Sequence, residues 1–299
     1  MINLKFWKKK GSAQHAQETR QELIKSKKML GSFEVVRELG QGSMGIVYQG
    51  KDIQSGRYAA IKTITLADDF DEYLEDAKLQ FLREAKILIW LDHPDIIRVY
   101  DVGQEHGLLY ISMEYFEGVK MSEFIRPGKL LPLTETLEII AQVAEALGYA
   151  HEQNIVHCDI KPDNIMYDVA SKAIRVIDFG ISRLIYYYAT TNRLVIGSPA
   201  YMSPEQIRKS QIDGRSDLFS LGTVLYELVS GRLPFKGDSM TEMINSIVNE
   251  PHADILLIRP DLPPCFAEII NRALNKDVEG RFQSGREMAM AIRRCAAML

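Results

Sequence analysis

Apolar and polar positions follow two different periods along the chain, and the period changes near residue 118. Before that point, short runs of β-branched and aromatic residues end at glycines or polar turns, which is typical of strands. One longer stretch has apolar residues at helical spacing and ends before His93-Pro94. The pattern predicts strands at residues 33–39, 46–48, 59–62, 96–100 and 108–115, with one helix at residues 70–90.

After residue 118 the pattern is mainly helical. Residues 133–153 place apolar side chains along one buried face. Residues 213–299 read as helical segments that are broken by Gly231 and by several prolines. A short apolar run, residues 174–177, predicts a strand in this part. The sequence shows no internal repeat and no low-complexity tract.

The composition is typical of an ordinary globular protein. With 299 residues and 46% hydrophobic content, the chain can bury a sizeable core in one large domain or in two lobes. The formal net charge of -4 gives no reason to expect nucleic acid as a partner. The sequence has no run of about 18 apolar residues and no signal peptide, so neither membrane spanning nor secretion is predicted.

The cysteines are few and odd in number. Cys158, Cys265 and Cys295 form no C-x-x-C pair and have no neighbouring cluster of metal ligands. This pattern argues against a disulfide framework and against a zinc site. A reducing compartment is the simpler interpretation, and a cytoplasmic location is expected.

The first 30 residues are basic and polar, which indicates a solvated arm or a marginal helix. Within this arm, Ile2, Leu4, Phe6 and Trp7 stand next to Lys8-Lys9-Lys10. Such a group can contact an anionic membrane surface, but one short apolar group with a few lysines binds lipid only marginally. A solubilising tail is therefore favoured over membrane contact.

The densest group of reactive side chains lies between two apolar anchors, in residues 155–166. Asp159 can accept the proton of a hydroxyl group, Lys161 can neutralise a phosphate and Asn164 can hold a metal ion. Asp178 follows fourteen residues after Asn164, at the end of a predicted strand and before a phenylalanine and a glycine. Asn164 and Asp178 together supply two oxygen ligands suited to Mg²⁺ that bridges phosphates.

A glycine-rich stretch, Gly40-Gln41-Gly42-Ser43-Met44-Gly45, lies between two predicted strands. Such a turn lets backbone N–H groups approach phosphates because no Cβ lies in the way. A dinucleotide-binding turn leads into a helix instead, whereas Ile46-Val47-Tyr48 continues as a strand; a plain hairpin is the alternative that this stretch alone leaves open. Lys62 ends the next apolar strand and needs a carboxylate to position it. Glu84 on the predicted helix is the preferred partner, and Glu75 is its competitor.

The order and spacing of these motifs resemble those of the eukaryotic-type (Hanks-type) serine/threonine protein kinases, and the bacterial members most of all. The resemblance covers residues 33–292 and includes the H-x-D-x-K-x-x-N loop at Asp159 and the D-F-G motif at Asp178. It implies a two-lobed α+β protein kinase fold, with a small β-rich N-lobe that has one helix and a larger, mainly helical C-lobe. The implied bounds are 1–30 for a basic, flexible arm, 31–296 for the kinase domain, and 33–117 and 118–296 for its lobes.

The resemblance also implies a function and assigns roles to residues. The chain is expected to transfer the γ-phosphoryl group of ATP to serine and threonine hydroxyls of proteins, including its own, in intracellular signalling. Mg²⁺ is the expected cofactor ion and Mn²⁺ the alternative; protein substrates are the expected partners, and no oligomeric state follows from the sequence. The expected catalytic residues are Asp159 and Lys161, and the expected metal ligands are Asn164 and Asp178. The residues expected to bind the nucleotide are Leu39, Gly40, Gln41, Gly42, Ser43, Met44, Gly45, Ile46, Val47, Ala60, Lys62, Glu84, Glu114 and Phe116.

Further residues have expected roles in the same family pattern. Glu205, in a Ser-Pro-Glu sequence that resembles the end of the activation segment, is expected to pair with Arg281. Asp217 is expected to brace the catalytic loop, with an ordinary helix N-cap as its alternative role. The candidate autophosphorylation sites are Thr190, Thr191 and Ser198, of which Ser198 is favoured as a contact to Asp159.

The main departure from the family pattern is Cys158, which stands where many members have arginine. Arginine there binds a phosphate on the activation segment through charge-assisted hydrogen bonds, and cysteine cannot. We therefore hypothesise that activity does not depend on that phosphate, and we favour a small buried apolar role for Cys158 over a redox switch. An inactive scaffold and a small-molecule kinase are alternative functions. The presence of Lys62, Asp159 and Asp178 disfavours the first, and the Ser-Pro-Glu motif disfavours the second.

Overall fold

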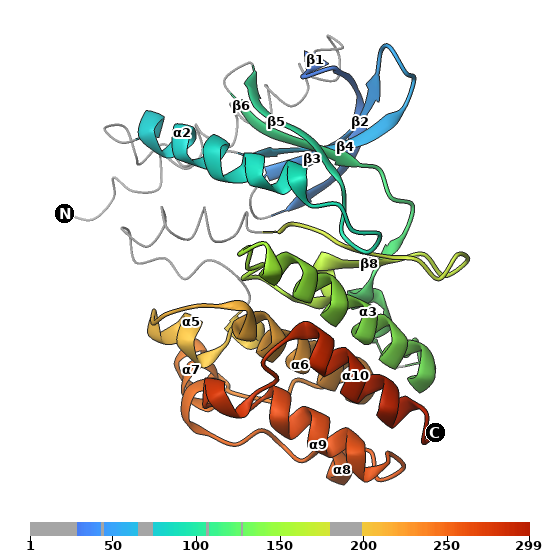
Figure 1. Ribbon diagram of the computed structural model, residues 1–299, viewed down its shortest axis with the longest axis vertical. Coiled ribbons are helices and arrows are strands. Elements are labelled where there is room, and N and C mark those ends of the chain that lie inside the picture. The colour runs from blue at the N-terminus through green and yellow to red at the C-terminus, as the bar shows by residue number, and fades with distance from the viewer. Residues whose placement is uncertain (1–28, 43–44, 65–73, 106–107, 127, 180–198) are drawn as a thin grey trace, which may run out of the picture. The chain divides into compact units, whose positions relative to one another are not determined.

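The computed structural model describes residues 29–42, 45–64, 74–105, 108–126, 128–179 and 199–299 of the chain (Figure 1). The chain divides into two compact units. The first comprises Met1–Trp90 and Arg98–Phe116, and the second comprises Leu91–Ile97 and Glu117–Leu299. The division after Phe116 lies one residue before the expected lobe boundary, and a short segment before residue 98 belongs to the second unit.

The first unit is built on a six-stranded antiparallel sheet in the order β1-β2-β3-β4-β6-β5. The strand expected at residues 96–100 begins later, at Val99, because Ile96 and Ile97 are buried in the second unit. There the Ile97 N–H donates to the Val176 carbonyl, at 3.0 Å. The strands are β1 (Met29–Leu30), β2 (Phe33–Gly42), β3 (Gly45–Asp52), β4 (Tyr58–Ile64), β5 (Val99–Glu105) and β6 (Leu108–Glu114).

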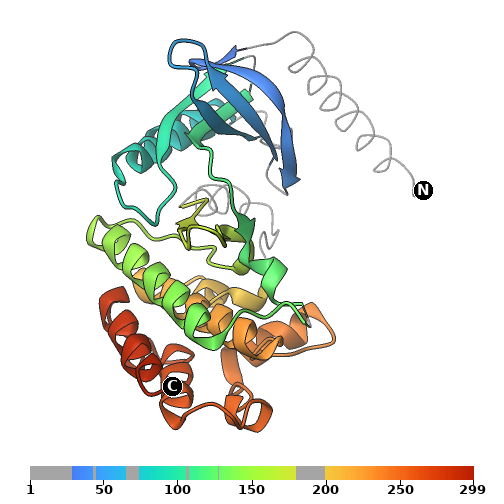
Figure 2. The same cartoon turned by 90° about the vertical axis from the view of Figure 1, so that its right-hand side faces the viewer.

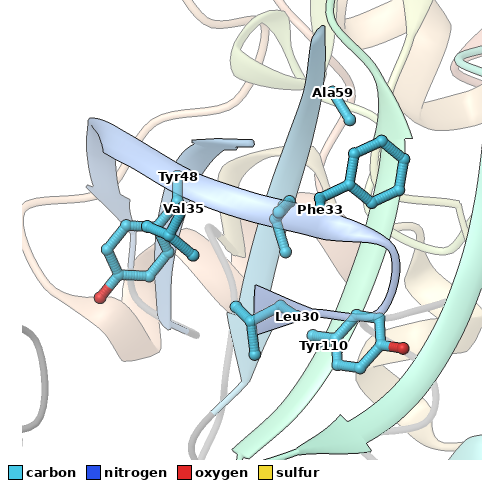
Figure 3. Close-up of a cluster of buried hydrophobic side chains, with 7 residues drawn as sticks. Leu30, Phe33, Val35, Tyr48, Ala59 and Tyr110 are labelled. Carbon is cyan, nitrogen blue, oxygen red and sulfur yellow. The ribbon is translucent and has the colours of Figure 1, made fainter. Parts of the chain in front are cut away.

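Side chains from most of these strands meet in one apolar cluster (Figure 3). Leu30 of β1 is fully buried in it, so the sheet includes the last two residues of the expected arm. The turn after β1 is fixed to the opposite edge strand, because the Gly31 N–H donates to the Glu105 carboxylate at 3.1 Å. The sheet therefore curls until its two edges are linked. The buried members of the cluster are Leu30, Phe33, Val35, Tyr48, Ala59, Ile61 and Tyr110.

One α-helix, α2 (Leu74–Ala85), accompanies this sheet, and a 3-10 segment, η2 (Lys86–Trp90), continues it. Phe81, Ala85 and Leu88 are buried on one side. The helix that the sequence predicts at residues 70–90 is therefore present, but its last turn is tightened, and its expected first residues lie outside the described part of the chain.

The second unit is mainly helical and carries a small sheet in the order β7-β8-β9. Within the described residues, no helix combines the length and apolar character needed to cross a membrane. The strands are β7 (Val119–Lys120), β8 (Ile165–Tyr167) and β9 (Ile174–Val176). The helices are α3 (Leu133–Glu152), α5 (Pro204–Arg208), α6 (Gly214–Ser230), α7 (Met240–Asn249), α8 (Ile255–Ile258), α9 (Pro264–Ala273) and α10 (Gly285–Ala296), with 3-10 segments η3 (Met121–Phe124), η4 (Pro162–Asn164), η6 (Pro199–Tyr201) and η7 (Val278–Gly280).

Helix α6 is the centre of this unit. Fourteen of its seventeen residues are buried, from Ser216 to Val229, so it is enclosed on all sides. A Cβ at Gly222 would lie only 2.6 Å from the Ala273 Cβ, which shows how closely α9 approaches it. A buried helix of this kind gives the site residues at its N-terminus a rigid base.

Helices α3 and α10 lie side by side (Figure 1, Figure 2). A Cβ at Gly285 would lie 1.9 Å from the Ala144 carbonyl oxygen, so only glycine permits this approach. The Arg293 guanidinium donates to both Glu138 and Glu145 of α3, at 3.0 Å and 2.5 Å for the nearest pairs. These bonds hold the pKa of Glu145 below its ordinary value, although burial opposes them.

A disulfide joins Cys265 of α9 to Cys295 of α10, with 5.8 Å between the Cα atoms. The sequence prediction that argued against disulfides was therefore wrong for this pair. The two cysteines are 30 residues apart and belong to no local motif. Only the packing of the two helices brings them together, and spacing along the chain does not report it.

Removal of this disulfide should lower the free energy of unfolding by about 3–4 kcal/mol, because a cross-link across 30 residues restricts the unfolded chain. Urea unfolding of the unchanged protein and of the double variant Cys265→Ser/Cys295→Ser, each with and without a reducing agent, measures this effect. The reducing agent should destabilise only the unchanged protein, down to the level of the variant. Four identical curves would show that the cross-link does not form.

Candidate active site

The small sheet of the second unit brings the two ends of the predicted site together. Ile165 pairs with Val176, and the Ile177 N–H donates to the Asn164 carbonyl at 2.9 Å. The ladder therefore places Asn164 beside the residue that precedes Asp178. The strand that the run at 174–177 predicts is present as β9, which contains the β-branched residues Ile174 and Val176.

Asp159, Lys161 and Asn164 form one hydrogen-bonded group. The Lys161 Nζ lies 2.6 Å from the Asp159 Oδ2. The Asn164 amide N–H donates to the Asp159 carbonyl at 2.7 Å and to its Oδ2 at 3.1 Å. A carboxylate held in this way, beside a cation, can orient a hydroxyl group and accept its proton. The three side chains that the sequence singled out in this loop are thus in contact.

His157 fixes the backbone of the same loop. Its buried ring donates from Nε2 to the Ile177 carbonyl at 2.8 Å, while its Nδ1 accepts the Asp159 N–H at 3.2 Å. These two bonds require the neutral tautomer with its proton on Nε2. The ring also packs on Phe179, at 4.6 Å between centroids. His157 therefore links the loop to the strand that ends at Asp178.

Asp178 has a left-handed backbone, with φ of 66°. A residue other than glycine rarely adopts this conformation, and it costs of the order of 1 kcal/mol or more. The adjacent Phe179 is buried and holds the turn in place. The glycine of the D-F-G motif, residue 180, lies outside the described residues, as do Thr190, Thr191 and Ser198.

Asp217, in the first turn of α6, braces the catalytic loop as predicted. Its carboxylate is 1% exposed and accepts the N–H groups of His157 and Cys158, each at 2.8 Å. It also accepts the Nε2–H of His151 at 2.8 Å. The alternative role as an N-cap is wrong, because Asp213 caps α6.

Gln206 is a site residue that the sequence interpretation missed. Its side-chain amide donates to the Cys158 carbonyl at 2.8 Å and accepts from the Ser203 N–H at 2.8 Å. The Ser203 hydroxyl oxygen in turn accepts the Gln206 N–H, which completes a capping box at the start of α5. The sequence Ser203-Pro204-Glu205-Gln206 carries this signal, since serine and glutamine three residues apart form such boxes.

The predicted pair of Glu205 and Arg281 is confirmed. Two guanidinium nitrogens of Arg281 donate to the two carboxylate oxygens at 2.7 Å and 2.8 Å, and both residues are buried. The Ser216 hydroxyl donates to the same carboxylate at 2.5 Å. Burial alone would raise the pKa of Glu205, but the hydrogen bonds from Arg281 and Ser216 outweigh it and leave the pKa below its ordinary value.

The described end of the activation segment is attached to α6. The Tyr201 hydroxyl donates to the Glu227 carboxylate at 2.6 Å, and the Ser220 hydroxyl donates to the Tyr201 carbonyl at 2.7 Å. Burial raises the pKa of Glu227 above its ordinary value, although the bond from Tyr201 partly opposes the shift. The segment that leads into α5 therefore has fixed anchors on the central helix.

The first unit places the expected nucleotide-binding residues on neighbouring strands. Val47 pairs with Lys62 between β3 and β4, and Ala60 pairs with Met113 between β4 and β6. Lys62 is buried, whereas Glu84 on α2 is exposed. A contact between them stays a prediction, and the side chain of Glu75 lies outside the described residues. The hairpin of β2 and β3 carries Leu39, Gly40, Gln41, Gly42, Gly45, Ile46 and Val47, with Ser43 and Met44 outside the described residues, and Glu114 and Phe116 lie at the end of β6 and just after it.

Gly45 and Gly40 of this hairpin differ in whether the fold requires glycine at their positions. Gly45 has φ of 148°, and a Cβ there would lie 1.8 Å from the Thr63 carbonyl oxygen, so the fold itself requires glycine. A Cβ at Gly40 would meet nothing within 4 Å. The fold itself therefore does not demand glycine at this position. Without a Cβ, Gly40 leaves the backbone open to the close approach of an external group.

Known proteins share this sequence pattern. Residues 33–291 match the family described as "Protein kinase domain". A protein of Streptomyces coelicolor named "Probable serine/threonine-protein kinase" is 38% identical over 274 residues, which cover 89% of this chain and 40% of that protein. Serine/threonine-protein kinase PrkC of Bacillus subtilis is 35% identical over 274 residues, which cover 91% of this chain and 41% of PrkC. The chain spans about two fifths of the length of these curated relatives.

A solved structure shares the fold. The crystal structure of Rad53 1-466 in complex with AMP-PNP matches with a TM-score of 0.71 and 24% sequence identity. The match covers 86% of this chain and 64% of that chain. The shared fold agrees with the protein kinase fold that the sequence predicted.

The variant Arg281→Met should lower the free energy of unfolding by about 3–5 kcal/mol, because it leaves the Glu205 carboxylate buried without its partner. The double variant Glu205→Gln/Arg281→Met should recover part of this loss. The pKa of Glu205 in the fold lies below its ordinary 4.5, so the pair contributes fully above pH 4.5 and loses its contribution as the pH falls through the lower value.

Denaturant unfolding from pH 7 down to pH about 3 measures both effects. The unchanged protein should lose stability below pH 4.5 more steeply than the double variant, in which this carboxylate is absent. Parallel pH curves for the two proteins would contradict the assigned ion pair.

Proposed function

Since the chain belongs to the protein kinase family, we propose that it transfers the γ-phosphoryl group of Mg·ATP to serine or threonine hydroxyls of proteins. The observation that carries this proposal is the contact group of Asp159, Lys161 and Asn164 on a loop that Asp217 braces. The names of the matched relatives support the choice of serine and threonine as acceptors.

Asp159 and Lys161 are the proposed catalytic residues. Asp159 orients the acceptor hydroxyl and takes its proton, and Lys161, 2.6 Å away, supplies positive charge for the phosphoryl group in transit. The transition state spreads negative charge over the phosphoryl oxygens, so positioning and cationic stabilisation supply most of the catalysis. The contact between Asp159 and Lys161 supports both proposed roles.

Asn164 and Asp178 are the proposed metal ligands, and their chemistry fits Mg²⁺. Asn164 directs its amide nitrogen to Asp159, which leaves its amide oxygen on the other side. Among the described residues, no three histidine, cysteine, aspartate or glutamate side chains gather around a possible metal position. Two protein oxygens with phosphates and water suit Mg²⁺, and Mn²⁺ is the alternative. When bound, the ion neutralises charge on the phosphates.

The first unit is the proposed holder of the nucleotide. Lys62 extends from β4 beside Val47, and its ammonium is the proposed partner of the α- and β-phosphates, with Glu84 to position it. The open space around Gly40 supports approach of phosphate to the hairpin backbone. The backbone groups of Glu114 and Phe116 are the proposed partners of adenine.

The backbone contacts of Cys158 support the hypothesis that activity does not depend on a phosphate on the activation segment. The loop is fixed at this residue by its backbone, since the Cys158 N–H donates to Asp217 and its carbonyl accepts from Gln206. The side chain is partly exposed, which disagrees with the expected buried apolar role. A cytoplasmic location stays a prediction, and the disulfide between Cys265 and Cys295 is uncommon in that compartment.

Replacement of Asp159 by asparagine should reduce phosphoryl transfer to a generic basic protein by at least about a thousandfold, because an amide cannot take the hydroxyl proton. Binding of ATP, measured by calorimetry with Mg²⁺, should change little. The matched control is Asp168→Asn in the turn between β8 and β9, where asparagine can accept the same hydrogen bond from Ala170 N–H.

Phosphate incorporation and phosphosite mapping give the readout. Phosphoserine or phosphothreonine from the unchanged protein and from Asp168→Asn, but not from Asp159→Asn, is the expected result. Nucleotide binding without transfer in all three proteins would favour a binding scaffold instead. Transfer to a panel of small-molecule acceptors alone would favour a small-molecule kinase.

A further inference from the structure

Helices α9 and α10 form a covalent ring that is closed at both ends. Residues 274–284 connect the end of α9 to the start of α10. The disulfide joins Cys265, in the first turn of α9, to Cys295, in the last turn of α10. While the ring is closed, the end of α10 cannot separate from α9. Once the disulfide is opened, residues 274–284 are the remaining covalent connection between the two helices and act as a hinge.

The two cysteines of this disulfide differ in their exposure to solvent. Cys265 is partly exposed and follows the exposed Pro264. Cys295 is only 1% exposed, on the buried side of α10. In thiol–disulfide exchange, the attacking thiolate must make direct contact with one of the two sulfur atoms. A thiol in solution therefore reaches the disulfide at Cys265.

The polar contacts between the C-terminal half of α10 and α3 lie at the surface. The Arg293 side chain and its partners Glu138 and Glu145 expose between 39% and 50% of their surfaces. Ion pairs as exposed as these contribute little to stability. Ile292 and Cys295 are the buried residues in this half of the helix. A large part of the restraint on this end of α10 therefore comes from the cross-link.

The hinge carries a residue of the buried polar network. Arg281 lies within residues 274–284, and its guanidinium donates to both carboxylate oxygens of Glu205, at 2.7 Å and 2.8 Å. Glu205 lies in α5, where the next residue, Gln206, donates to the Cys158 carbonyl at 2.8 Å. Movement of the hinge therefore changes the support of the catalytic loop through α5.

We propose that the disulfide of Cys265 and Cys295 is a site of reversible thiol–disulfide exchange with a dithiol reductant, and that reduction releases the end of α10 and loosens the hinge that carries Arg281. A thiolate of the reductant attacks the Cys265 sulfur, the S–S bond breaks, and Cys295 leaves as a thiolate that takes up a proton. The second thiol of the reductant then attacks the reductant's own sulfur in the mixed disulfide, and Cys265 leaves.

The two steps balance, because the protein gains two electrons and two protons and the dithiol loses them as it becomes a disulfide. Reoxidation by a disulfide oxidant reverses both steps. The effect of reduction on catalysis rests on the proposed function, whereas the exchange and the release of α10 do not.

The point of entry is tested on the unchanged protein with glutathione, a monothiol that forms a mixed disulfide. The reaction is stopped with acid, free thiols are alkylated with N-ethylmaleimide in urea, and the cysteine peptides are mapped by mass spectrometry. Glutathione on Cys265 and N-ethylmaleimide on Cys295 is the expected result. Glutathione on Cys295 would overturn the proposal. So would a disulfide that dithiothreitol reduces only after the protein has unfolded.

Hydrogen exchange measures the release of α10 without ATP. In the unchanged protein, dithiothreitol should speed the exchange of backbone amides in residues 275–284 and 290–296 by at least about tenfold, because the open ring permits local unfolding. Strands β3 and β4 of the first unit are the internal reference and should not change. The variant Cys265→Ser/Cys295→Ser should exchange at the fast rate with or without dithiothreitol. Equal rates in the oxidised and reduced unchanged protein, a comparison that needs no variant, would overturn the proposal.

Phosphoryl transfer to a generic basic protein gives the functional readout. At about 37 °C the reduced protein should lose this activity at least about threefold faster than the oxidised protein, and oxidised glutathione should reverse the difference. The variant Cys265→Ser/Cys295→Ser should not respond to dithiothreitol, which separates this effect from any reaction at Cys158. Loss of activity without faster hydrogen exchange would contradict the proposal. Absence of transfer from both forms would contradict the proposed function, while the hydrogen exchange still decides this proposal.

Discussion

The arrangement of the catalytic loop depends on one buried carboxylate. Asp217 accepts the N–H groups of two consecutive loop residues, His157 and Cys158, and the ring N–H of His151. Hydrogen bonds to an ionised acceptor are about twice as strong as neutral ones, and each buried donor left without an acceptor costs about 1–3 kcal/mol. Without this carboxylate, the N–H groups of His157 and Cys158 would lose this acceptor. The positions of Asp159 and Lys161 follow from this constraint.

The carbonyl side of the same loop is held by a second residue. Gln206 of α5 donates to the Cys158 carbonyl, so both polar groups of that residue's backbone are engaged. Helix α5 is in turn fixed by Glu205, which pairs with Arg281 inside the unit. The end of the activation segment, the catalytic loop and the C-terminal helices therefore form one connected network of buried polar groups. A change at Arg281 acts on the loop through α5 rather than by contact.

The features that could be predicted are those that correspond to an apolar period or to a motif in the sequence. Helix α3 was predicted to within a residue because its apolar face repeats regularly, and the pair of Glu205 with Arg281 was found because each residue stands in a family motif. The disulfide and the late start of β5 were missed, since both arise from packing between segments. Cys265 and Cys295 meet only because α9 and α10 are neighbours. Gln206 differs from these two features, because the serine and glutamine of its capping box can be recognised in the sequence.

Cysteine is tolerated at position 158 because the hydrogen bonds that hold this residue use its backbone atoms. Cys158 has φ of 67°, a left-handed conformation that costs a residue other than glycine about 1 kcal/mol or more. The two backbone hydrogen bonds to Asp217 and Gln206 offset that cost, and neither uses the side chain. Arginine and cysteine can therefore occupy the same backbone. The backbone that leads to Asp159 is therefore held by bonds that do not depend on the side chain at position 158.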